Sequence, residues 1–76
     1  MILKKADNTN LNDIIKIYEE AFPFIERKPF DVMLNNSDNM EILAIEDKKT
    51  LGLVISAVYK DIVLVDYLAV DKNERG

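Results

Sequence analysis

The first candidate for chemistry in this sequence is Asp66, which interrupts the apolar run "IVLVDYLAV" of residues 62–70. Strand alternation predicts that its carboxylate lies on an otherwise apolar face, where desolvation raises a carboxyl pKa towards values useful for a general base. Such a base would remove the proton of an ammonium group before the amine attacks an electrophile. A carboxylate that is hydrogen-bonded to a helix, or tolerated at a sheet edge, is the structural alternative.

The composition excludes several other kinds of catalysis. The chain contains no cysteine and no histidine, which excludes thiol oxidoreductases, cysteine proteases, zinc fingers and Ser-His hydrolases. The lack of cysteine fits a reducing cytoplasm, where we expect the protein to be. What chemistry remains must rest on carboxylates, tyrosines, lysines and the backbone.

Charge and hydropathy argue against two classes of partner. The net charge is −4, and the basic residues are scattered as the pairs 4–5, 27–28 and 48–49, whereas nucleic-acid binders cluster their lysines and arginines. No signal peptide is recognised, and no apolar run approaches the roughly 20 residues of a membrane-spanning helix. We therefore expect neither a nucleic-acid nor a membrane partner.

Hydrophobic periodicity predicts the elements that position Asp66. Residues 2–6 are expected to form an opening strand, and apolar residues recur every three or four positions from Leu11 to Phe22, which is typical of a helix. Asn10 is the expected N-cap, and Pro23 ends this helix. A second helix is expected to begin at Pro29, with one face formed by Phe30, Met33 and Leu34, and to end in the polar residues 35–39.

From residue 40 onward the period changes to two, which predicts three strands over residues 40–46, 51–59 and 62–70. The whole is thus one α+β (α/β) domain, strand-helix-helix followed by a three-stranded antiparallel meander. A tight turn at Lys60-Asp61 predicts the register of the last hairpin, in which Tyr59 faces Ile62, Ala57 faces Leu64 and Ile55 faces Asp66. That register gives one face with Leu53, Ile55, Ala57, Leu64 and Leu68, and another with Val54, Val58, Val63, Val65, Tyr67 and Ala69.

Both predicted faces of the meander are apolar, but two helices can cover only one of them. We therefore expect a homo-oligomer, or another chain that completes the sheet. One hypothesis is accordingly a non-catalytic α/β module that self-associates through its exposed last strand.

The element order, together with the stretches "LNDIIKIYEEAFP", "ERKPF" and "VDYLAVDKNERG", resembles the N-terminal half of the GNAT superfamily of N-acetyltransferases. The resemblance spans residues 1–76 as a partial domain with no second domain. It implies transfer of an acetyl group from acetyl-CoA to the amine of a small molecule or peptide. We expect this fragment alone to be inactive, because the family's glycine-rich pyrophosphate loop would begin only at Arg75 and Gly76.

The resemblance also implies roles for individual residues. The backbone of Leu68, Ala69 and Val70 would hold the pantetheine arm, and the amide near Leu68 would polarise the thioester. Arg75 and Gly76 would contact the pyrophosphate. Asp66 is the candidate catalytic base, although the carboxylate of the histone-modifying branch aligns with Leu64. Phe24, Arg27 and Tyr67 would border the acceptor amine, and Glu26 and Arg27 could select a charged substrate. The alternatives are a core aromatic for Tyr67 and a surface ion pair or cap for Arg27.

Overall fold

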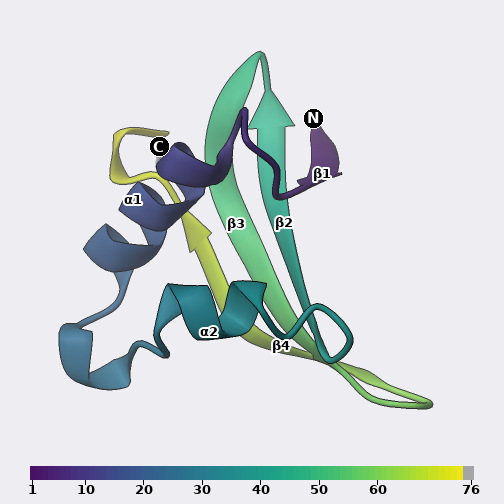
Figure 1. Cartoon of the computed structure of the whole chain (residues 1–76). Coiled ribbons are helices and arrows are strands. Elements are labelled where there is room, and N and C mark those ends of the chain that lie inside the picture. Colours follow the sequence, from purple (N-terminus) through teal and green to yellow (C-terminus); the bar gives the residue numbers. More distant parts are fainter. Residues whose placement is uncertain (75–76) are drawn as a thin grey trace.

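The structure, a computed structural model, describes residues 1–74 and has the predicted α+β order (Figure 1). One strand and two helices precede a three-stranded antiparallel meander. Two short 3-10 turns, η1 and η2, were not predicted. The elements are β1 (Ile2–Lys5), α1 (Leu11–Ala21), η1 (Phe24–Glu26), α2 (Phe30–Leu34), β2 (Met40–Asp47), β3 (Lys49–Val58), β4 (Val63–Val70) and η2 (Lys72–Glu74).

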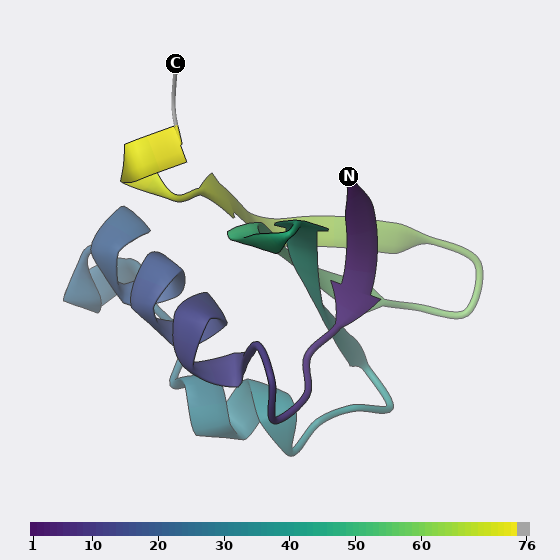
Figure 2. The ribbon, with the colours of Figure 1, turned by 90° about the horizontal axis from the view of Figure 1, so that it is seen from above.

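The four strands form an antiparallel sheet in the order β1-β2-β3-β4, so β1 and β4 are its edges within residues 1–74. Both helices cover the same face, with α1 packed on β3 and β4 and α2 packed on β2 (Figure 2). The core lies between these two layers. Its buried residues are Ile14, Ile17, Tyr18, Met33, Ile42, Ala44, Leu53, Ile55, Tyr67 and Ala69.

The ends of α1 follow the sequence closely, with one correction. Phe22, which precedes Pro23, is extended (φ −123°, ψ 132°), so the helix ends where the proline predicted. Asn10 does precede the first helical residue, but its side chain makes no capping hydrogen bond. The predicted N-cap position is confirmed, but the capping hydrogen bond is absent because the amide of Asn10 is engaged by other partners. Pro29 likewise lies one residue before α2 rather than at its first position.

The β2–β3 hairpin is tighter than the sequence suggested. Lys48 alone forms its tip in the left-handed region (φ 69°), and Asp47 pairs with Lys49. A register shift between Ile45 and Glu46 follows.

The β3–β4 hairpin confirms the predicted register near its turn and corrects it beyond Val65. Ala57 pairs with Leu64 as predicted, but Ile55 pairs with Tyr67 and not with Asp66. Asp66 is the extra residue of a β-bulge, which reverses the facing of every later side chain in the strand.

The bulge moves Tyr67 and Ala69 into the core, where each is 8% exposed, and turns Leu68 outward at 62% exposure. The predicted faces are therefore wrong for Tyr67, Leu68 and Ala69. The physical reason is that this register buries a tyrosine whose hydroxyl has partners and keeps the Asp66 side chain partly exposed, at 28%, beside Lys28.

The face of the sheet opposite the helices carries no helix of residues 1–74, which confirms that the two helices cover one face only. The side chains of Val63, Val65 and Leu68 on β4 are 58–62% exposed, and Leu3 on β1 is 60% exposed. None of the helices in this part of the chain combines the length and apolar character needed to cross a membrane.

Candidate functional site

Asp66 lies at the bulge of β4 and is paired with a lysine. Its Oδ2 accepts a hydrogen bond of 2.8 Å from Nζ of Lys28, in the segment between η1 and α2. This contact raises the pKa of the Lys28 ammonium above its usual value, chiefly through the hydrogen bond to Asp66. The carboxylate predicted to lie on an apolar face is thus exposed and carries a cationic neighbour.

Tyr67, the next residue, fixes the segment that carries Lys28. Its hydroxyl accepts a hydrogen bond from the Lys28 N–H at 3.0 Å and donates one to the Glu26 carbonyl at 2.9 Å. Tyr18 of α1 donates to the Lys28 carbonyl at 2.7 Å. The two rings also pack edge to face, with centroids 4.9 Å apart. Burial first, and then the neighbouring Tyr67 hydroxyl, raise the pKa of Tyr18.

Tyr67, predicted to border the acceptor amine or to be a core aromatic, lies in the core and does not line the pocket described below. The ring is a core aromatic, and its hydroxyl holds residues 26–28 in place. A sequence cannot reveal such a contact, since Tyr67 and Glu26 are 41 positions apart.

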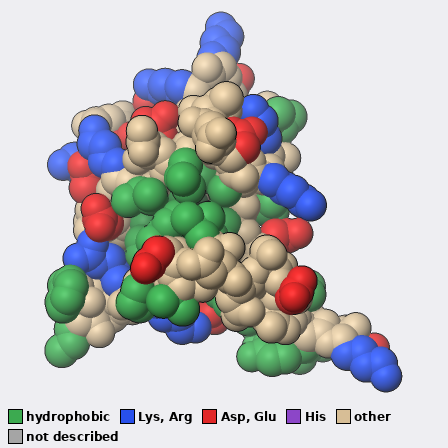
Figure 3. Space-filling view, viewed as in Figure 1, with side chains coloured by type: hydrophobic (Ala, Val, Ile, Leu, Met, Phe, Trp, Pro, Cys, Tyr) green, Lys and Arg blue, Asp and Glu red, His purple; other side chains and the backbone are tan. Residues whose placement is uncertain are grey.

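Arg27 and Lys28 form one side of a pocket of about 620 Å³ between α1 and α2, called here the α1–α2 pocket. This volume is within the range of small-molecule sites. Hydrophobic side chains project at the η1 corner beside Lys and Arg side chains, at the lower left of Figure 3. The pocket is lined by Tyr18, Glu19, Phe24, Ile25, Arg27, Lys28, Pro29 and Phe30.

The structure brings two predicted substrate residues, Phe24 and Arg27, together in this pocket. The Arg27 guanidinium carbon lies 5.5 Å from the centre of the Phe24 ring. Nη1 of Arg27 lies 3.6 Å from Oε2 of Glu19, so the alternative of a surface ion pair is present as well. Among the described residues, Nε of Arg27 is a buried side-chain nitrogen that has no hydrogen-bond partner.

The predicted cofactor residues Leu68, Ala69 and Val70 end β4, an edge strand within residues 1–74. Asp71 donates its N–H to the Leu51 carbonyl at 2.7 Å, which continues the ladder past the strand. Antiparallel alternation then directs the backbone groups of Ala69 towards β3 and those of Leu68 towards the open edge. Arg75 and Gly76, also predicted to bind the cofactor, lie outside the described residues.

The close approach of β4 to β3 depends on Gly52. A Cβ at this position would collide with the carbonyl oxygen of Ala69. The absence of a side chain at Gly52 therefore fixes where the end of β4 lies.

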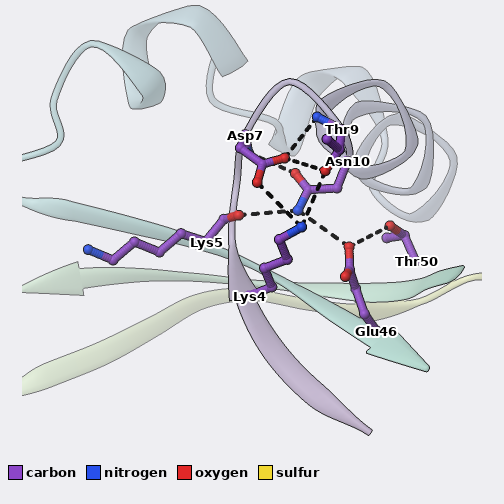
Figure 4. Close-up of polar contacts among 7 residues, drawn as sticks. All are labelled: Lys4, Lys5, Asp7, Thr9, Asn10, Glu46 and Thr50. Carbon is purple, nitrogen blue, oxygen red and sulfur yellow. Dashed lines mark hydrogen bonds and ion pairs between the residues drawn. The ribbon is translucent and has the colours of Figure 1, made fainter. Parts of the chain in front are cut away.

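A second polar cluster lies at the opposite end of α1, and the sequence analysis did not identify it. In this cluster Asn10 is 1% exposed. Its Oδ1 accepts the Asp7 N–H at 2.8 Å, and its Nδ2 donates to the Lys5 carbonyl at 3.1 Å and to Oε2 of Glu46 at 3.4 Å (Figure 4). We call this cluster the N-terminal junction; its residues are Lys4, Lys5, Asp7, Thr9, Asn10, Glu46 and Thr50.

The only local signal for the N-terminal junction was the sequence "ADNTN", in which Asp and Asn favour turns with side-chain-to-backbone hydrogen bonds. Within residues 1–74, no group of three acidic or other metal-ligating side chains is arranged to hold a metal ion. The chain matches no protein-family model, no curated protein and no solved structure.

Proposed function

We propose that this chain is part of an acetyl-CoA-dependent N-acetyltransferase of the GNAT superfamily, with the thioester bound along β4 and the amine bound in the α1–α2 pocket. The observation that carries the proposal is the bulge at Asp66 in an edge strand. Bulges concentrate beside active sites, where they interrupt strand pairing and redirect side chains. Here the bulge lies between the open backbone of Leu68 and the lysine that lines the pocket.

An extended pantetheine chain carries amide groups that can pair with an open strand edge, as in β-augmentation. The open edge near Leu68 would supply this pairing. A backbone N–H near Leu68 would also stabilise the negative charge that develops on the thioester oxygen.

In the proposed reaction the amine nitrogen attacks the acetyl carbon, the C–N bond forms and the C–S bond of the thioester breaks. Before the attack a base removes one proton from the ammonium, which frees the nitrogen lone pair, and the departing thiolate of coenzyme A takes the second N–H proton. Asp66 is the proposed base, and its Oδ2 lies 2.8 Å from Nζ of Lys28, a residue that lines the pocket proposed for the amine.

The test is a titration of the 76-residue protein with S-acetylpantetheine and acetyl-CoA, followed by amide NMR shifts. We expect shifts concentrated at residues 65–70. The variant Leu68→Pro removes an N–H at the open edge, a position that tolerates proline, and should abolish them. Shifts absent from β4 at millimolar ligand, or unchanged in Leu68→Pro, would contradict the proposal.

A second candidate function, self-association, is favoured by the exposed surface area. The chain exposes 5450 Å², whereas a monomer of 8.7 kDa is expected to expose about 4,700 Å². The difference is close to the roughly 800 Å² that one partner contributes to a standard interface. The uncovered face of β4, with Val63, Val65 and Leu68, would supply it.

Sedimentation equilibrium tests self-association at about 10–100 μM, concentrations above a micromolar Kd. We expect a dimer that Val65→Lys converts to monomer, while Lys16→Ala on the exposed side of α1 has no effect. A wild-type protein that stays monomeric over this range would refute this second function without bearing on the first.

A further inference from the structure

Two neighbouring hydrophobic side chains line the α1–α2 pocket and face solvent. Phe24 is 84% exposed and Ile25 is 91% exposed, the highest values among the exposed large hydrophobic residues described. Scattered exposed hydrophobic residues need no explanation, but these two are adjacent in η1 and border one hollow. Their side chains are suited to pack against an apolar group of a ligand.

The exposure of Phe24 and Ile25 is enforced by the fold. At the last residue of η1 and two residues beyond it, the backbone is held by hydrogen bonds with the hydroxyls of Tyr18 and Tyr67 at 2.7–3.0 Å. These three hydrogen bonds fix the backbone of Glu26 and Lys28, which directly follows Phe24 and Ile25. A pocket that is formed before a ligand arrives loses less conformational entropy on binding.

The polar side of the pocket is formed by Arg27, whose guanidinium is only loosely held by Glu19. Nε of Arg27 is buried without a partner in the described chain, and Nη1 is held by Glu19 only at 3.6 Å. A buried donor without an acceptor is destabilising, and an unbound ligand is one ordinary explanation for it. A carboxylate suits this guanidinium well, because it can accept two parallel N–H···O bonds.

We propose that the α1–α2 pocket binds an α-amino acid with an apolar side chain. The side chain would contact Phe24 and Ile25, the carboxylate would accept hydrogen bonds from Arg27, and the ammonium would pair with Glu19. The zwitterion thus replaces one loose internal ion pair with two ligand contacts, which keeps the charge of the pocket balanced. That this amine accepts an acetyl group rests on the proposed function, whereas its binding does not.

Three probes separate the contributions of the ligand: L-phenylalanine, 3-phenylpropanoate, which lacks the amine, and phenethylamine, which lacks the carboxylate. Binding to the 76-residue protein is measured by amide NMR shifts and calorimetry without acetyl-CoA. We expect shifts at residues 24–30 and the order L-phenylalanine, 3-phenylpropanoate, phenethylamine from tightest to weakest. Arg27→Gln should weaken the binding of L-phenylalanine by about tenfold or more and leave the binding of phenethylamine nearly unchanged.

Phe24→Ser provides a second variant at a site where folding is not at risk, and it should weaken all three probes alike. Lys16→Gln, a matched loss of one positive charge on the exposed side of α1, should change nothing. Phenethylamine binding as tightly as L-phenylalanine, shifts elsewhere than residues 24–30, or an unaltered affinity in Arg27→Gln would each overturn the proposal.

The two proposals fail separately. If L-phenylalanine shifts the amides of residues 24–30 while S-acetylpantetheine causes no shifts on β4, the amino-acid pocket is supported and the acetyltransferase proposal is wrong. If S-acetylpantetheine shifts β4 and no probe binds the pocket, the amino-acid proposal is wrong and the acetyltransferase stands.

Discussion

The two ends of α1 handle polar groups in opposite ways. At the N-terminal junction, the fully buried amide of Asn10 has three protein partners on β1, the following turn and β2. At the α1–α2 pocket, a buried nitrogen of Arg27 has none in the described chain, and two large apolar side chains face solvent. The buried polar group at the N-terminal end of the helix is fully paired within the fold. At the other end, a buried donor lacks a partner within residues 1–74 and apolar side chains face solvent.

This difference separates residues that hold the fold from residues available to a ligand. Satisfied buried polar groups specify a unique packing, whereas unsatisfied ones and exposed apolar groups lower stability unless something binds them. The α1–α2 pocket is nonetheless rigid, because Tyr18 and Tyr67 hold its backbone. The side chains of the pocket are free to contact a ligand, while its backbone is held in place by hydrogen bonds.

The comparison predicts its largest effect at Asn10. The substitution Asn10→Ala leaves the Asp7 N–H and the Lys5 carbonyl without this partner in a buried site, so the free energy of unfolding should fall by about 3 kcal/mol. Urea denaturation measures it. Asn12→Ala, the same change at an exposed position of α1, is the matched control and should stay within about 0.5 kcal/mol of wild type. Equal losses of unfolding free energy in Asn10→Ala and Asn12→Ala would show that the N-terminal junction does not stabilise the fold.

A smaller effect is expected at Tyr67. Tyr67→Phe removes the hydroxyl that holds residues 26 and 28, so unfolding should become easier by about 1–2 kcal/mol. Amide exchange at Lys28 should accelerate more than exchange at Ile14, which is in the core. Tyr59→Phe, at a tyrosine that is 57% exposed, is the control. Unchanged exchange at Lys28 would show that Tyr67 does not fix the pocket.

The two ends of α1 should also respond to opposite extremes of pH. The pKa values of Tyr18 and Lys28 are raised, Tyr18 first by burial and Lys28 first by its hydrogen bond to Asp66. Their contributions are complete below the ordinary values near 10 and are lost as pH rises through the raised values. The pKa of Asp7 is lowered, chiefly by hydrogen bonds from Thr9, so its contribution is present above pH 3.8 and is lost as pH falls through the lowered value.

Amide exchange as a function of pH distinguishes these two windows. Protection of residues 26–28 should decrease in alkali, and protection of residues 7–10 should decrease in acid. In Tyr18→Phe the alkaline decrease should be smaller, while the acid decrease is unaltered. Simultaneous loss at both ends in either window would mean that the two regions unfold together.

The smallest stability effect is expected at Phe24, because its ring buries little area. Phe24→Ser should change the free energy of unfolding by no more than about 0.5 kcal/mol. Phe22→Ser, which removes a half-buried ring 4.9 Å from Tyr67, should cost about 2–3 kcal/mol. A large loss at Phe24 would make it a structural residue and weaken the ligand argument.

The sequence predicted the elements well where a local pattern carried the information. The apolar period of residues 11–22 and Pro23 predicted α1 to within a residue, and the alternation after residue 40 predicted the meander. The register of the last hairpin was predicted only up to Val65. The local sequence does not distinguish a bulge at Asp66 from continued pairing, because the same apolar residues form a strand in either register.

The candidate site was predicted in parts. Phe24 and Arg27 do lie together in one pocket, and Asp66 does lie at the adjoining strand. The sequence did not reveal Lys28 as the partner of Asp66, the hydroxyl of Tyr67 as the support of the pocket, or Asn10 as a buried node. Each of these depends on contacts between segments distant along the chain.

The sequence by itself determined which segments are helix or strand, because helix and strand periods and proline geometry are local properties. The tertiary structure alone decided which face Tyr67 occupies and where Asp66 points. Packing against α1 favours the register in which Tyr67 is buried with its hydrogen-bond partners and the carboxylate of Asp66 is in contact with water. That choice depends on the free energy of the whole core.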